Sequence, residues 1–243
     1  MPQSLLASRL LALLDLTSLG EDDSPIRIRA LCASACTPYG QPAAVCVYPE
    51  HVTSAREALA GTPIKIASVV NFPEGGDDPQ RVHRETRRAV AAGADEIDMV
   101  LAWRALRAGD TARAKAGVEA CRQACGTGIT LKLILETGEL ASPALIRDAS
   151  AIGLDAGVDF LKTSTGKVPV NATLPAATLM LDAIAERGGQ CGLKVAGGIR
   201  TLGEAQQYLA LVDAKLGSAW AAPMRFRIGA SALFDAIVAE LGH

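Results

Sequence analysis

Eight short apolar runs recur along this chain at intervals of 20 to 35 residues, and longer amphipathic segments separate them. Apolar runs that alternate with helical patterns indicate parallel strands joined by crossover helices rather than hairpins. Eight β/α units predict an α/β fold of the (β/α)8, or TIM barrel, class. The predicted strands are Leu13–Leu19, Ala44–Tyr48, Ile64–Val70, Asp95–Val100, Thr130–Glu136, Asp159–Ser164, Gly192–Gly197 and Phe226–Ala230.

The whole chain, residues 1–243, is predicted to form one barrel domain. Its 243 residues, 49% of them hydrophobic, suit a single core, and no linker or low-complexity tract divides them. Residues 1–14 lack the basic start and the cleavage site of a signal peptide, so we expect a short extra N-terminal helix there. Pro79 and Gly93 predict a helix over 79–92. The alternative is an open doubly wound sheet, but no G-x-G-x-x-G follows the first strand.

Charge, hydropathy and cysteine content argue against several classes of function. A formal net charge of −2 offers no basic surface for nucleic acid, and no apolar stretch approaches the ~18 residues of a membrane-spanning helix. Six scattered cysteines without a C-x-x-C favour reduced thiols and a cytoplasmic location. His51, His83 and His243 lie far apart, so we expect neither a metal site nor any other cofactor.

Three of the 7 lysines, Lys132, Lys162 and Lys194, lie within predicted apolar strands. Because side chains alternate across a strand, the apolar neighbours of these lysines face the outer helices and the lysines point into the barrel. The same alternation turns three more side chains inward, namely Asp15, Cys46 and Asp98. A lone buried lysine is more often ion-paired or reaches solvent, as we expect of Lys65. Several charges in one small interior are costly, which favours a functional site.

A lysine amine becomes a nucleophile when its pKa falls from about 10.4 toward neutrality. Two ammonium groups ~6 Å apart at an effective dielectric of ~20 repel by about 3 kcal/mol, which is roughly two pKa units. One Schiff-base lysine, one charged lysine and one carboxylate together meet the needs of a class I aldolase. Lys162, Lys194 and Asp98 are therefore the predicted catalytic residues.

A phosphate site is predicted beyond the ends of the last three strands. Thr165, Gly166 and Lys167 supply a hydroxyl, a turn and a cation, and the Gly197-Gly198 pair lets backbone N–H groups approach an anion. Ser231 precedes the last helix, whose N-terminus favours negative charge. Barrels commonly bind phosphate in the loops after strands 7 and 8. The alternatives are that the glycines form a plain turn and that Ser231 is only an N-cap.

The chain closely resembles the deoxyribose-phosphate aldolases from about Leu14 to Leu233. The matching stretches are DLT (15–17), AVCVYP (44–49), VNFP (70–73), GADEID (93–98), LKLILET (131–137), FLKTSTG (160–166) and KVAGGIR (194–200). The resemblance implies a metal-independent cytosolic barrel enzyme. Such an enzyme reversibly cleaves 2-deoxy-D-ribose 5-phosphate to acetaldehyde and D-glyceraldehyde 3-phosphate.

The resemblance also implies a role for each candidate residue. Lys162 matches the Schiff-base lysine, Lys194 the lysine that lowers its pKa, and Asp98 the proton-relay carboxylate. Lys132 and Asp15 match polar residues around the substrate, and Cys46 lies beside the site. The remaining matches bind substrate hydroxyl or phosphate groups, namely Thr165, Gly166, Lys167, Gly197, Gly198 and Ser231. The expected partners are a phosphorylated sugar and aldehydes. A second copy of the chain is a further candidate partner, in a homodimer or a homotetramer.

Three departures from the family pattern are visible. Val195 replaces a proline at an outward position, which we expect to matter little. Ala232 replaces a second serine and is expected to weaken phosphate binding. The chain ends at His243 without the tyrosine-bearing tail of some members, so we expect slower turnover. The competing functions are a transaldolase-like enzyme or phospho-sugar aldolase with another donor, and an inactive barrel that only binds a sugar phosphate.

Overall fold

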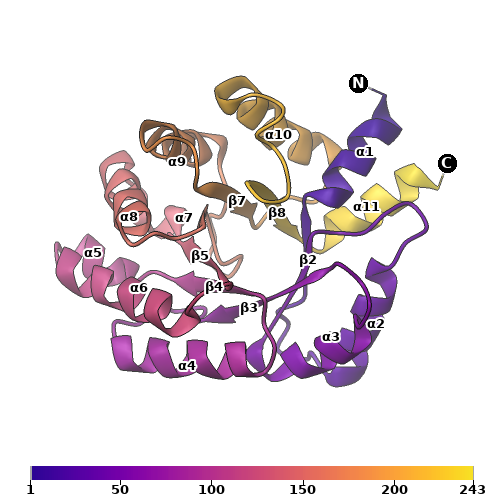
Figure 1. The fold of residues 1–243 in the computed structure, drawn as a ribbon. Coiled ribbons are helices and arrows are strands. Elements are labelled where there is room, and N and C mark those ends of the chain that lie inside the picture. Colours follow the sequence, from indigo (N-terminus) through magenta and orange to yellow (C-terminus); the bar gives the residue numbers. More distant parts are fainter. Residues whose placement is uncertain (1, 243) are drawn as a thin grey trace.

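Eight parallel strands close into a barrel in the computed structural model, which describes residues 2–242 (Figure 1). Neighbours in sequence are neighbours in the sheet, and β8 pairs with β1 to close it. The (β/α)8 prediction is confirmed, and each strand lies within its predicted run. The strands are β1 (Leu14–Thr17), β2 (Ala44–Val47), β3 (Lys65–Val70), β4 (Glu96–Val100), β5 (Thr130–Ile134), β6 (Phe160–Lys162), β7 (Gly192–Ala196) and β8 (Phe226–Ala230).

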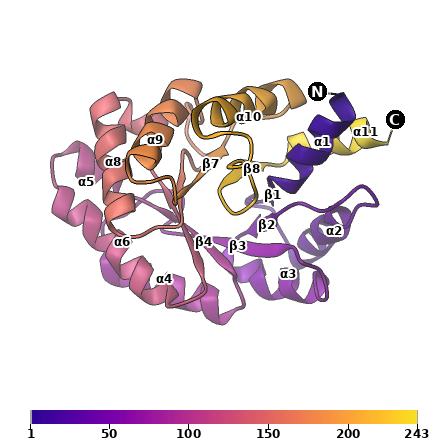
Figure 2. The same cartoon turned by 45° about the horizontal axis from the view of Figure 1, so that its top comes forward.

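Helices surround the strands (Figures 1 and 2). They bury the outward side chains of the strands. Their bounds are α1 (Gln3–Ala12), α2 (Pro25–Ala35), the 3-10 helix η1 (Pro49–His51), α3 (Val52–Ala58), α4 (Pro79–Ala91), α5 (Trp103–Arg107), α6 (Thr111–Cys125), α7 (Thr137–Leu140), α8 (Pro143–Asp155), α9 (Leu174–Glu186), α10 (Leu202–Leu216) and α11 (Ala232–Leu241). Within residues 2–242, no helix is both long and apolar enough to span a bilayer.

Local signals in the sequence set several helix starts. Asp78 caps α4, its side chain accepting the N–H groups of Gln80 and Arg81. Thr201 and Glu204 form a reciprocal capping box at the start of α10. The helix α1 precedes the barrel and packs against α11, which brings the two ends of the described chain together (Figure 1).

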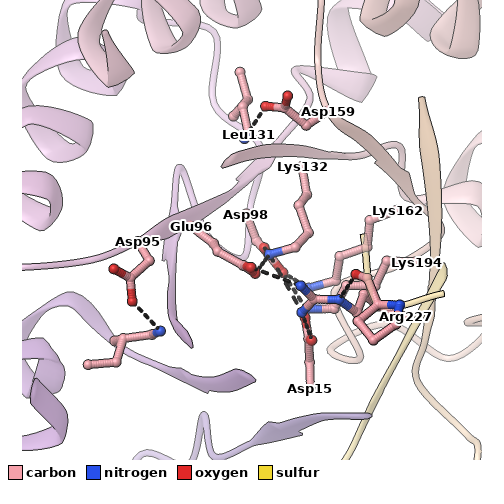
Figure 3. Close-up of polar contacts among 12 residues, drawn as sticks. Asp15, Asp95, Glu96, Asp98, Leu131, Lys132, Asp159, Lys162, Lys194 and Arg227 are labelled. Atoms are coloured by element: carbon pink, nitrogen blue, oxygen red, sulfur yellow. Dashed lines mark hydrogen bonds and ion pairs between the residues drawn. The ribbon is translucent and has the colours of Figure 1, made fainter. Parts of the chain in front are cut away.

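Two carboxylates tie neighbouring strands together where β4 and β6 begin. Asp95 Oδ2 accepts the Ile66 N–H of β3, and Asp159 Oδ2 accepts the Leu131 N–H of β5, both at 2.8 Å (Figure 3). Arg122 Nη1 lies 2.9 Å from the same Asp159 oxygen. These hydrogen bonds fix the strand register on which the alignment of inward side chains depends.

The barrel interior has an apolar part and a larger charged part. On β2 and β3 it holds a small apolar cluster made of Ala44, Cys46, Ala67 and Val69. The strands β1 and β4 to β8 instead contribute buried charged side chains. An interior filled by branched apolar residues is the usual arrangement in such barrels, so the charged part is the candidate functional region.

Candidate active site

Asp98 on β4 is the carboxylate that three buried lysines share in the charged part of the barrel interior. Its Oδ1 accepts a hydrogen bond from Lys132 Nζ at 2.8 Å, and its Oδ2 accepts from Lys162 Nζ and from Lys194 Nζ, each at 2.7 Å (Figure 3). The three lysines come from the adjacent strands β5, β6 and β7. All four side chains are buried, and Lys162 is only 2% exposed. The structure thus brings together four of the five inward charges that strand alternation predicted, and the fifth, Asp15, contacts Lys194.

A second set of ion pairs joins this centre to β1, β4 and β8. Asp15 Oδ2 lies 2.6 Å from Lys194 Nζ, and Glu96 Oε2 lies 2.5 Å from Lys132 Nζ. Arg227 Nη1 donates to Asp15 Oδ1 at 2.6 Å, and its Nη2 donates to Glu96 Oε1 at 3.0 Å (Figure 3). Asp15 and Glu96 therefore each bridge the Arg227 guanidinium to a lysine.

The lysines of this network differ in their proton affinity. Burial lowers the pKa of Lys162; the carboxylate of Asp98 opposes the change, and the Lys194 ammonium adds to it. The pKa of Lys194 is raised, because its ion pairs with Asp15 and Asp98 outweigh the effect of burial. The pKa of Lys132 is raised for the same reason, by Asp98 and Glu96. Lys162 is therefore the lysine of the three that gives up its proton most easily.

A cavity of about 270 Å³ opens beside Lys162. It lies where the C-terminal ends of β1, β6, β7 and β8 meet, which is the end that carries active sites in this fold. Its volume falls near the lower end of the range for small-molecule sites, roughly 300 Å³. The lining residues are Thr17, Leu19, Lys162, Thr165, Gly166, Lys167, Ala196, Gly197, Gly198, Ile199, Arg200, Gly229, Ala230, Ser231 and Ala232.

Glycines and a helix start shape the rim of this cavity. Gly197 and Gly198 have φ angles of 86° and 84°, a conformation that favours glycine. A Cβ added to Gly197 would lie 2.6 Å from the Asn171 side chain, so the close approach also requires glycine. Ser231 occupies the N-cap of α11, but its hydroxyl makes no capping hydrogen bond. Its side chain is exposed and available to a ligand.

Glu136 orders the loop that follows β6. Its carboxylate accepts the Thr165 N–H at 3.1 Å and the Thr165 hydroxyl at 2.5 Å. The Thr165 Oγ1 in turn accepts the Lys167 N–H at 3.0 Å, and Lys167 Nζ donates to the Leu19 carbonyl at 2.6 Å. Burial raises the pKa of Glu136, against the effect of its hydrogen bonds from Thr165. This chain of contacts fixes the loop against the cavity, which Leu19, Thr165 and Lys167 line.

Residues 9–235 match the DeoC/LacD family aldolase. The match covers all eight strands, including every charged residue of the interior.

This chain belongs to the DeoC/LacD aldolase family.

Solved structures agree with the assignment to this lyase family. Two named "putative deoxyribose-phosphate aldolase" are similar over nearly the whole chain. The one from Toxoplasma gondii ME49 is 27% identical with a TM-score of 0.89, over 99% of this chain and 97% of that one. The one from Coccidioides immitis is 29% identical with a TM-score of 0.83, over 94% and 85%. A tetrameric deoxyribose phosphate aldolase from Aeropyrum pernix, 22% identical, shares the fold with a TM-score of 0.77, over 98% and 94%.

The candidate residues of this DeoC/LacD aldolase separate into two groups. Those that line the cavity are Lys162, Thr165, Gly166, Lys167, Gly197, Gly198 and Ser231. Those buried in the barrel interior are Asp15, Cys46, Asp98, Lys132 and Lys194. Burial raises the pKa of the Cys46 thiol, so Cys46 is a neutral interior side chain rather than an exposed reactive thiol. Lys65 is exposed at the start of β3 and is not part of the network.

Three residues of the network and the cavity loop were not predicted from the sequence. Glu96 lies two positions before Asp98, and Arg227 lies between Phe226 and Ile228, so the alternation that found the lysines also applies to them. Glu136 follows β5 with φ at 58°, a left-handed conformation that leaves no periodic signal. Within residues 2–242, no three His, Cys, Asp or Glu side chains form a group suited to a metal ion.

Proposed function

We propose that this protein is a class I aldolase that reversibly cleaves 2-deoxy-D-ribose 5-phosphate to acetaldehyde and D-glyceraldehyde 3-phosphate. The observation that supports it most is the position of Lys162. Its Nζ is bound to Asp98, its pKa is lowered by burial and by Lys194, and it borders a cavity at the catalytic end of the barrel. An amine with a lowered pKa beside a carboxylate is what Schiff-base formation needs.

The proposed cleavage begins at the aldehyde carbon of the open-chain sugar. The Lys162 amine adds to this carbon, and loss of water from the carbinolamine leaves an iminium ion. Loss of the proton from the C3 hydroxyl converts C3 to the aldehyde carbon of D-glyceraldehyde 3-phosphate, which leaves as the C2–C3 bond breaks. The electron pair of that bond forms the C1=C2 bond of an enamine on the lysine nitrogen. Protonation of C2 and hydrolysis of the resulting imine release acetaldehyde and the free amine.

Asp98 is the proposed proton relay for these steps. It accepts a hydrogen bond from the reacting nitrogen, and burial keeps bulk water from competing with it. Lys132 and Lys194 hold the pKa of Asp98 well below its usual range, against the effect of burial. The carboxylate therefore stays ionised, which is the protonation state in which it can receive a proton from the reacting groups.

The part of the cavity lined by Gly197, Gly198 and the start of α11 is the proposed phosphate site. The backbone N–H groups at Gly197 and Gly198, the free Ser231 hydroxyl and the start of α11 border the same space. A helix N-terminus and closely approaching amides favour a phosphate dianion. Lys167 and Arg200 add positive charge at the rim. Ala232 lines the cavity at the start of α11 and contributes no hydroxyl there.

One experiment tests the site and the chemistry together. The protein is incubated with acetaldehyde and reduced with borohydride, and its peptides are examined by mass spectrometry. We expect an ethyl group on Lys162. A parallel incubation of acetaldehyde with D-glyceraldehyde 3-phosphate should yield 2-deoxy-D-ribose 5-phosphate. Trapping only by a ketone donor would indicate another sugar-phosphate aldolase, and an unmodified Lys162 would indicate a barrel that only binds ligand.

A further inference from the structure

The charged side chains of the barrel interior form a single connected network. This network contains one more basic group than it has carboxylates. Its members are linked by contacts of 2.5 to 3.0 Å, and all are buried. The four basic members are Lys132, Lys162, Lys194 and Arg227, and the three acidic members are Asp15, Glu96 and Asp98. With every member ionised, the network carries one surplus positive charge. Loss of one proton removes that charge from a region where net charge is costly.

The contacts indicate which basic group carries the surplus proton. Arg227 keeps its charge at any ordinary pH. Lys194 contacts both Asp15 and Asp98, and Lys132 contacts both Glu96 and Asp98. Lys162, by contrast, forms an ion pair only with Asp98 among the described residues. It shares the Asp98 oxygen of this ion pair with Lys194. It is the least compensated cation of the four.

Arg227 lies outside the cavity, and its two ion pairs reach the carboxylates that hold the other two lysines. Its Nη1 contacts Asp15 at 2.6 Å and its Nη2 contacts Glu96 at 3.0 Å. The guanidinium thus supplies the fourth positive charge without touching Lys162.

We infer that Arg227 is a positioning residue. By pairing with Asp15 and Glu96, it leaves Lys162 as the basic group of the barrel interior that has no carboxylate of its own and loses its proton first. This inference rests on the proposed function, because it explains how the pKa of the proposed nucleophile, Lys162, is lowered. The effect of Lys194 on its neighbour is then one part of a charge balance that extends to β8.

The other titratable groups around Lys162 leave this balance unchanged. Cys46 on β2 is a neutral thiol because burial raises its pKa, and the interior of β3 contributes Ala67 and Val69. Glu136, after β5, is outside the ion-pair network, with both oxygens bound to Thr165. None of the variants compared below changes Glu136, so its effect on Lys162 is the same in all of them.

The test compares variants that break the same ion pair with opposite changes of charge. Arg227→Met removes a cation, Glu96→Gln removes an anion, and Arg227→Lys keeps the charge with a different shape. The readout is the rate of Lys162 acetylation by acetic anhydride as a function of pH, followed on its peptide by mass spectrometry. Its midpoint reports the protonation of Lys162 without requiring aldolase activity. Arg87→Met, at an exposed arginine of α4, is the matched control.

We expect the acetylation midpoint of Arg227→Met to rise by about one pH unit or more, because the surplus charge is gone. The midpoint of Glu96→Gln should fall, and those of Arg227→Lys and Arg87→Met should stay near the wild-type value. Midpoints that are unchanged, or that move in the same direction for Arg227→Met and Glu96→Gln, would overturn the inference. If Arg227→Met does not fold, the acetylation midpoint of Glu96→Gln tests the inference alone: a lower midpoint supports it and an unchanged one overturns it.

This result is separate from that of the aldehyde-trapping experiment. A wild-type Lys162 that is acetylated at neutral pH but forms no adduct with acetaldehyde would refute the proposed function alone. A Lys162 that is trapped by acetaldehyde, with the same acetylation midpoint in all variants, would refute the role of Arg227 alone.

Discussion

Lys162 and Lys194 donate to the same carboxylate oxygen, Asp98 Oδ2, each at 2.7 Å. Their nitrogens are therefore no farther apart than twice this distance, although Asp98 is 64 positions from one lysine and 96 from the other. Two ammonium groups this close repel strongly in a buried site. Asp98 and Asp15 together stabilise the Lys194 charge, so the repulsion acts mainly on Lys162.

Replacing Lys162 with leucine should abolish turnover and leave the fold intact. The remaining three cations and three carboxylates of the network balance, so the variant buries no additional net charge. We expect kcat to fall by at least about four orders of magnitude. The melting temperature should change by no more than about 5 °C. Steady-state kinetics and thermal unfolding measure the two effects, and measurable turnover from a folded Lys162→Leu protein would contradict the assigned nucleophile.

The Lys194→Leu substitution should shift imine formation to higher pH. Removing the neighbouring ammonium raises the pKa of Lys162, because a like charge no longer opposes its protonation. Borohydride trapping by acetaldehyde across a pH series measures the shift, which we expect to be about one unit or more. Lys115→Leu, at an exposed lysine of α6, is the control. An unchanged pH profile in Lys194→Leu would refute the role given to this lysine.

An Asp98→Asn variant should lose both stability and turnover. It leaves three buried lysines without their shared anion, and breaking a buried pair typically costs about 3–5 kcal/mol. Loss of the proton relay should lower kcat by about 10²–10⁴-fold. Urea unfolding and steady-state kinetics measure these changes. A variant as stable as the wild type would show that the network does not depend on this carboxylate.

A Ser231→Asp variant should weaken binding of the phosphorylated sugar selectively. The new carboxylate would stand at the start of α11 beside the proposed phosphate site and repel a dianion. We expect KM for 2-deoxy-D-ribose 5-phosphate to rise by roughly 10-fold or more, equivalent to about 1.4 kcal/mol. Unphosphorylated 2-deoxy-D-ribose is the matched control substrate, and its kinetics should not change. Equal losses for both sugars would place the phosphate elsewhere.

Acid should destabilise the protein through Asp15 and Asp98. Despite burial, ion pairs hold the pKa of each carboxyl below its ordinary value, through Lys194 and Arg227 for Asp15 and through the three lysines for Asp98. Groups with a depressed folded-state pKa stabilise the fold above the unfolded value, near 3.9, and lose that contribution as pH falls toward the folded value. The free energy of unfolding in urea should therefore begin to drop near pH 5 and should still be falling at about pH 3. A flat profile would argue against ionised carboxylates in the interior.

The sequence by itself determined the barrel and most of the charged residues that face its interior. Apolar runs at regular intervals located all eight strands, because side-chain burial within one strand is a local pattern. The same alternation turned Lys132, Lys162, Lys194 and Asp98 inward, and it held for Glu96 and Arg227 as well. What it could not give was which of these charges touch.

Only the tertiary structure decided the pairing of these charges. Asp15 and Arg227 are 212 positions apart and meet because β8 closes onto β1. The left-handed turn at Glu136, which binds Thr165, depends on the packing of the loop after β6. Periodicity records which face of a strand a residue occupies, whereas the distances that set a proton's affinity arise when strands far apart in sequence come together.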